Sequence, residues 1–204
     1  LFKEQFGELA QDKKVFHALL KQVFGPNYDV KKAESFRQQA CKGDYSWLPP
    51  IEFVDGKTLQ GGHGAYDAQS GVVYLNSELR HNPALLAQTY VEEAGHHLDA
   101  QLNKSDTVGD EGELFRRILA GESLSHAQIS AIKSENDKGT IYVDGKAINV
   151  EFWNPFKAIG NAIKSVVKGV VNVAKGIGNA ISSVAKTVGK AVKGVVEGAA
   201  HVVK

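Results

Sequence analysis

The spacing of apolar positions in the first 152 residues switches between a helical and a strand-like period. Apolar residues three or four positions apart predict helices, and short apolar or alternating runs between turn residues predict strands. Asn82-Pro83 is a typical helix start, since Asn caps and Pro fits the first turn. Asp144-Gly145 predicts the turn of a β-hairpin. We expect an α+β domain with a small mixed sheet, its helices at 9–24, 29–41, 83–103, 111–119 and 126–135 and its strands at 51–54, 72–75, 140–143 and 147–152.

Residues 157–203 follow a different pattern, an eleven-residue repeat. Eleven residues make nearly three helical turns, so positions eleven apart stay on one side of a helix. One such column consists of Ile159, Val170, Ile181, Val192 and Val203. Lysines lie roughly opposite the aliphatic columns, at Lys157, Lys164, Lys168, Lys175, Lys186 and Lys190. The pattern predicts a cationic amphipathic helical tail.

Three surroundings for this tail remain open. Its glycines and β-branched residues make it a weak helix in water, so it needs a surface to fold against. An anionic membrane is favoured, because lysines would meet headgroups while valines reach the acyl boundary. The alternatives are packing on the protein or in an oligomer, and disorder or aggregation as an edge strand. A transmembrane span is not expected, because no stretch of about 18 residues lacks lysine.

Charge divides the chain at the same place. Residues 153–204 contain eight lysines and one glutamate, a net charge of +7, whereas residues 1–152 carry −6. This asymmetry predicts a boundary near 152–155, with domain 1–152 and tail 153–204. Nucleic acid is disfavoured as a partner, because the tail has no arginine and its repeats contain no aromatic residue.

Two single residues add little to this picture. Cys41 is the only cysteine, so we expect no internal disulfide and a small buried apolar side chain. The chain begins at Leu1 rather than Met, which is typical of a processed product or a piece of a longer protein.

The chemistry is expected on the helix that contains residues 91–99. In the zinc-protease helix His-Glu-x-x-His, two ligands one turn apart hold the metal and the intervening Glu activates water. Here Glu92 and His96 have that spacing, and Glu93 takes the position of the general base. A carboxylate can replace the first imidazole, which shifts the preference from Zn²⁺ toward harder ions such as Ca²⁺ or Mn²⁺. Asp99, one turn after His96, is a further ligand candidate.

A third ligand is expected from the acidic residues that begin the next helix. We favour Glu111, with Asp110 as an additional candidate. Asp110 and Glu113 also fit a capping-box pair, which would be structural. The structural alternative for the first helix is an exposed polar face of Glu92, His96 and Asp99. Further candidates are His97 and the loop residue His63, which is more typically exposed to solvent.

Several motifs occur in the same order in a bacterial family. They are Leu48-Pro49-Pro50-Ile51-Glu52, Gly64-Ala65-Tyr66, Val73-Tyr74-Leu75-Asn76, Glu92-Glu93-x-Gly95-His96-x-x-Asp99, Gly109-Asp110-Glu111-Gly112, Leu124-Ser125-x-x-Gln128 and Asp144-Gly145. Residues 10–152 therefore resemble an uncharacterised zincin-like module of large secreted proteins, common in cyanobacteria and often found beside haemolysin-type calcium-binding repeats. The resemblance implies secretion and a metallopeptidase-like site. In zincin-type peptidases a short edge strand precedes the metal helix, and 64–76 is placed to supply it. The tail separately resembles antimicrobial or pore-forming peptides.

These observations favour a secreted, extracellular toxin or effector. Its zincin-like domain would bind Zn²⁺ through Glu92, His96 and Glu111 and hydrolyse a protein or peptide substrate with Glu93 as base. The tail would bring it to an anionic membrane, where oligomers can form. One alternative is a non-enzymatic membrane-permeabilising protein whose acidic domain keeps the tail soluble. Another is a catalytically inactive binding module of a larger surface protein.

A peptide of residues 153–204 is expected to release dye from anionic liposomes, because its lysines and valines suit the two sides of the interface. Fluorescence dequenching measures the release, and neutral liposomes serve as the control. Leakage together with unchanged toxicity of the Glu93→Gln protein would favour the non-enzymatic alternative. Intact anionic liposomes would contradict membrane activity.

Overall fold

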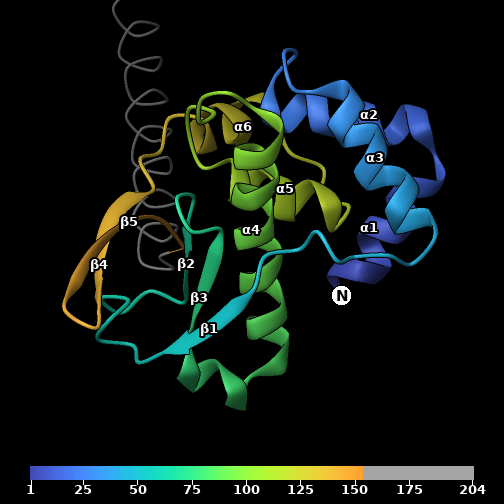
Figure 1. Ribbon diagram of the computed structural model, residues 1–204. Helices are drawn as coiled ribbons and strands as arrows, with labels where there is room; N and C mark the ends of the chain where they lie inside the picture. The colour runs from blue at the N-terminus through green and yellow to red at the C-terminus, as the bar shows by residue number, and fades with distance from the viewer. Residues whose placement is uncertain (154–204) are drawn as a thin grey trace, which may run out of the picture. The chain divides into compact units, whose positions relative to one another are not determined.

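The computed structural model describes residues 1–153, which form an α+β fold of helices and a mixed sheet (Figure 1). Residues 154–204 of the predicted tail lie outside the described residues, as do its lysines Lys157, Lys164, Lys168, Lys175, Lys186 and Lys190. The elements in order are α1 (Phe2–Gln11), α2 (Lys13–Phe24), α3 (Val30–Cys41), β1 (Ile51–Val54), β2 (Gly64–Asp67), β3 (Val72–Asn76), the 3₁₀ helix η1 (Ser77–His81), α4 (Pro83–Leu102), α5 (Glu111–Leu119), α6 (His126–Ile132), β4 (Lys138–Val143) and β5 (Lys146–Trp153).

The predicted helix 9–24 is wrong at its start, because two helices meet there. Asp12 has an extended backbone, and its side chain accepts hydrogen bonds from the amides of Lys14 and Val15. It therefore caps α2 and separates it from α1. The chain before it is also helical, since Phe2 and Phe6 recur one turn apart and are both buried.

The remaining predicted elements are confirmed with small shifts of their ends. The side chain of Asn82 caps α4 by accepting from the amide of Leu85, and Pro83 occupies the first turn. Asp144 and Gly145 both have positive φ, 49° and 75°, as the tight turn between β4 and β5 requires. Helix α6 ends at Ile132 rather than 135. Cys41 is exposed, so its expected burial is wrong.

The sheet has the strand order β1-β3-β2-β5-β4. Strand β1 runs parallel to β3, and every other neighbouring pair is antiparallel. The expected edge strand within 64–76 is wrong, because both of its strands, β2 and β3, are interior. Among the described strands, β1 and β4 form the edges.

Helix α4 lies between the sheet and the other helices (Figure 1). It contacts β2, β3 and β5 on one side and α1, α3 and α5 on the other. All nine residues from 91 to 99 are consequently buried. The alternative of an exposed polar face is therefore wrong, and the ionisable residues of this segment belong to the interior.

Apolar packing on both sides fixes α4 in place. Alternation along the strands puts Tyr66, Val73 and Leu75 on the face that packs against Leu86 and Tyr90 of α4. The opposite face of the sheet buries Ala65, Tyr74, Val150 and Phe152. Phenylalanines from α1, α2, α3 and α5 dominate the helical core. Within the described part, no helix has the length and apolar character needed to cross a bilayer.

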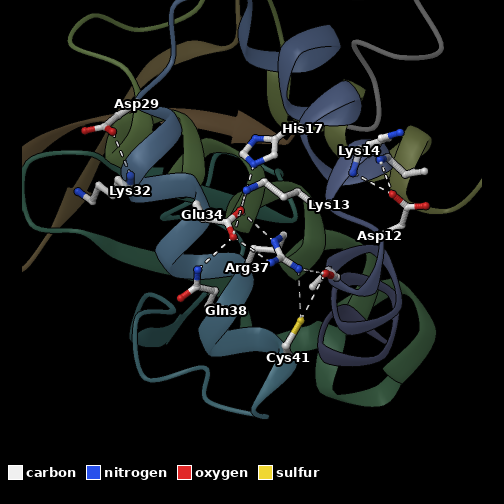
Figure 2. A network of polar contacts seen from close by, with 12 residues as sticks. Asp12, Lys13, Lys14, His17, Asp29, Lys32, Glu34, Arg37, Gln38 and Cys41 are labelled. Atoms are coloured by element: carbon white, nitrogen blue, oxygen red, sulfur yellow. Dashed lines mark hydrogen bonds and ion pairs between the residues drawn. The ribbon is translucent and has the colours of Figure 1, made fainter.

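A polar network on the outer side of the helices joins α2 to α3 (Figure 2). Glu34 accepts hydrogen bonds from Arg37 Nε at 2.9 Å and Nη2 at 2.9 Å and from Gln38 at 3.1 Å, and it contacts His17 at 3.2 Å. Arg37 also donates to the carbonyl of Ala10 in α1 at 2.7 Å. The hydrogen bonds from Arg37 and then from Gln38 hold the pKa of Glu34 well below its ordinary value.

Glu34→Gln is expected to lower the free energy of unfolding at pH 7 by about 1–2 kcal/mol, because it removes charged hydrogen bonds. The pKa of Glu34 is lower in the folded chain than in the unfolded chain, where the pKa of glutamate is about 4.3. Its contribution is thus complete above that pH and is lost as the pH falls. Urea unfolding at pH 7 and pH 2.5 should show the difference from wild type shrinking. Glu8→Gln, at an exposed position, is the control; an equal difference at both pH values would contradict the account.

Candidate metal centre

The site forms where α4 and α5 approach most closely. A Cβ atom built on Gly95 would lie 2.9 Å from the Cα atom of Gly112, so glycine at both positions permits the contact. A Cβ atom on Gly112 would collide with Nε2 of His96. The imidazole of His96 is thus packed directly against the first turn of α5, and it is fully buried.

Helix α5 begins beside this imidazole and presents two acidic residues to it. The side chain of Asp110 caps the helix by accepting from the amide of Glu113 at 2.7 Å. The return bond of a capping box is replaced, because the amide of Asp110 donates to the carbonyl of Ile132 at 3.1 Å. Glu111 Oε1 lies 2.8 Å from His96 Nδ1.

Four carboxylates lie within 4 Å of the two ring nitrogens of His96. Nδ1 is 2.8 Å from Glu111, 3.4 Å from Glu151 and 3.8 Å from Asp137. Nε2 is 3.8 Å from Asp110. Ligand atoms of His96, Glu111 and Glu151 lie within 4.8 Å of one another, as do those of His96, Asp110 and Asp137. These buried groups can hold a metal ion.

The sequence prediction missed Asp137 and Glu151, because no motif connects them to the helices. Asp137 directly precedes β4, and Glu151 lies in β5 opposite Lys138 and Tyr66. Val150 and Phe152 face the other core of the sheet, so alternation turns Glu151 toward α4. The predicted hairpin already contained that alternation. Only the position of α4 against this face makes Glu151 a site residue.

The four carboxylates around His96 outnumber the single imidazole that could carry a positive charge. Burial raises the pKa of Glu111 to about 7, of Asp137 to about 6 and of Glu151 to about 8. Burial also raises the pKa of Asp110. Burial alone would lower the pKa of His96, but its carboxylate neighbours, above all Glu111, outweigh that and raise it. One imidazolium cannot balance this set, so a cation would stabilise the ionised carboxylates.

Glu93 lies one turn before His96, and its carboxylate is completely buried. Neither of its oxygens has a hydrogen-bond partner among the described residues. A Cβ atom on Gly64 would lie 2.5 Å from Oε1, so the glycine of β2 leaves room for this carboxylate. Burial raises the pKa of Glu93 well above its ordinary value, and His96 counteracts part of the rise.

Glu92, the other predicted ligand on α4, is buried but has a different partner. Its Oε2 atom accepts a hydrogen bond from Arg116 Nε at 2.8 Å. It belongs to none of the candidate metal groups found in residues 1–153. The structure thus brings together His96, Glu111 and Asp110 of the predicted residues and places Glu92 on an arginine of α5.

The other three candidates have separate surroundings. His97 Nε2 donates to the carbonyl of Trp47 at 3.0 Å, so the neutral ring accepts at Nδ1 from the Tyr66 hydroxyl at 3.1 Å. Asp99 forms a group with Asp106 and Glu111. His63 is half-buried, and burial lowers its pKa. Neither His97 nor His63 joins a candidate metal group of the described residues.

A cleft of about 490 Å³ reaches the site from outside at Glu151. Tyr66, Asp106, Lys138 and Glu151 are among its lining residues. Glu151 therefore connects the buried imidazole to a space that a small ligand or a segment of chain can enter.

Gly112→Ala is expected to destabilise the fold by about 1–3 kcal/mol, because the new methyl group would displace a buried imidazole. Helix propensity alone predicts the opposite sign, a gain of about 1 kcal/mol. The urea-unfolding midpoint decides between the two signs. A stabilised variant would show that α5 does not press on His96.

No family model, curated protein or solved structure matches the chain. The function is therefore inferred from the geometry of the site.

Proposed function

We propose that residues 1–153 form a metal-dependent hydrolase domain that binds a divalent cation through His96, Glu111 and Glu151. One observation carries the proposal: four carboxylates lie within 4 Å of a single buried imidazole. Such an excess of buried acid costs free energy without a cation and suits one well. Asp137, whose Oδ2 atom has no hydrogen-bond partner among the described residues, supplies a further oxygen ligand.

The donor set narrows the choice of ion. Imidazole suits Zn²⁺ and other transition metals, whereas carboxylates suit Mn²⁺, Mg²⁺ and Ca²⁺. One nitrogen with two or three oxygens is compatible with Zn²⁺ and with Mn²⁺. Zn²⁺ binds more tightly when both compete for the same ligands, so we propose Zn²⁺ as the resident ion.

In the proposed hydrolysis, the ion and the residues of the site have separate roles. The bound ion would supply Lewis acidity and lower the pKa of water. Burial favours protonated Glu93, whereas a bound cation would favour its ionised form. Ionised Glu93 would accept the proton of the attacking water, since its carboxylate has no other described partner and lies one turn from His96. Arg116 holds Glu92 away from the ion through the 2.8 Å hydrogen bond. The resemblance to a zincin-like module favours a peptide bond as substrate, entering through the cleft at Glu151.

Metal binding provides the direct test. The chelator-treated protein is expected to bind Zn²⁺ in calorimetric titration and to gain thermal stability from it. His96→Ala removes a ligand, and the nearly isosteric Glu151→Gln removes the charge of one. Each should weaken metal binding by at least about 10–100-fold, the loss typical of a residue that only supports a ligand. His81→Ala, at an exposed histidine, is the matched control. Unchanged affinity in both site variants would refute the proposed ligands.

Glu93→Gln separates catalysis from binding in the same preparation. It should retain the ion and lose about 10²–10⁴-fold in the rate of peptide hydrolysis, the usual contribution of a general base. A quenched-fluorescence peptide library measures that rate. Hydrolysis at the wild-type rate in Glu93→Gln would remove Glu93 from the mechanism.

The remaining parts of the proposed role concern the whole chain. Secretion, an effector or toxin role and membrane binding by the tail are proposals from the sequence. The tail lies outside the described residues, so its charge and repeat pattern alone support them.

A further inference from the structure

We propose that the site holds two cations and that Glu111 bridges them, an inference that rests on the proposed function. Glu111 belongs to two candidate groups, one with His96 and Glu151 and one with Asp99 and Asp106. In each group the ligand atoms lie within 4.8 Å of one another. A carboxylate has two oxygens, so a single glutamate can serve both positions.

The two oxygens of Glu111 differ in their surroundings. Oε1 lies 2.8 Å from Nδ1 of His96, on the side of the first ion. Oε2 is buried and has no hydrogen-bond partner among the described residues. The whole side chain is only 1% exposed, so bulk water does not satisfy the free oxygen. A buried carboxylate oxygen without a donor is costly, and a second cation beside it would remove that cost.

Asp99 is already oriented for such an ion. It lies on α4 one turn after His96 and is buried. Asn103 Nδ2 donates to its Oδ1 at 2.7 Å, and the amide of Thr107 donates to its Oδ2 at 2.9 Å. The hydroxyl of Thr107 donates as well. These three bonds fix the carboxylate and leave one of its roughly four acceptor positions open.

Asp106 supplies the third ligand and the connection to solvent. It is exposed, and it lines both the 490 Å³ cleft and a second cleft of about 790 Å³ beside Asn103 and Thr107. An ion can therefore reach this position from outside. Lys138 Nζ lies 2.7 Å from Asp106 Oδ2 and competes with a cation there.

Paired ions change what the site can do. In two-metal centres the ions lie about 3.5–4 Å apart and contact the attacking and the leaving oxygens together. Asp106 of the second position and Glu151 of the first both line the 490 Å³ cleft. A substrate in that cleft would thus lie beside ligands of both ions.

The test is titration of the full-length, chelator-treated protein with Mn²⁺, followed by calorimetry and electron paramagnetic resonance. The wild type is expected to bind two ions and to show the exchange-coupled signal of a bridged pair. Asp106→Asn should lower the affinity for the second ion by at least about 10-fold and abolish the exchange coupling, while the affinity for the first ion changes by less than about three-fold. Asp144→Asn, in the hairpin turn, is the matched control.

A second variant moves the result in the opposite direction. Lys138→Gln removes the competing cation, so the second ion should bind up to about five-fold more tightly, the equivalent of an exposed ion pair. Both substitutions are at exposed positions, so both variants should fold. One bound ion, with neither variant altering it, would overturn the pair and leave the proposed function standing. No bound ion in the wild type would overturn both.

Discussion

The excess of buried acid around His96 costs folding free energy, which the packing on both sides of α4 has to offset. Glu111, Glu151, Asp137 and Asp110 converge on one imidazole from α5, from β5 and from the residue before β4. A purely structural interior would replace such groups with apolar residues at little cost. The aromatic core on one side of α4 and the sheet on the other hold them together instead.

Small residues make this convergence sterically feasible. Gly95 and Gly112 let α4 and α5 approach until the imidazole touches the first turn of α5. Gly64 in β2 leaves space for the carboxylate of Glu93 on the opposite side. The three glycines lie on three elements: Gly112 and Gly64 leave room for an ionisable side chain, and Gly95 lets the two helices pack closely. The close backbone packing at these glycines therefore also determines where the site lies.

Local patterns predicted most of the helices and strands, but only tertiary contacts identified the full set of candidate ligands. The cap at Asn82-Pro83 and the turn at Asp144-Gly145 are each recognisable from two neighbouring residues. Helix α4 and the β4–β5 hairpin were therefore predicted. The spacing of Glu92 and His96 correctly predicted a common helix, yet Glu92 bonds to Arg116. A four-residue spacing fixes only the side of the helix, whereas the partner depends on the facing element. Asp137 and Glu151 could not be predicted as site residues, because the sequence does not show how the sheet packs on α4.

Anomalous diffraction from crystals grown with Zn²⁺ would test the central claim most directly. Data collected above and below the zinc absorption edge locate the ion independently of the protein coordinates. A zinc peak is expected within about 2.0–2.2 Å of Nδ1 of His96 and of oxygens of Glu111 and Glu151. A zinc peak only at surface residues, with His96 still bonded directly to Glu111, would contradict it.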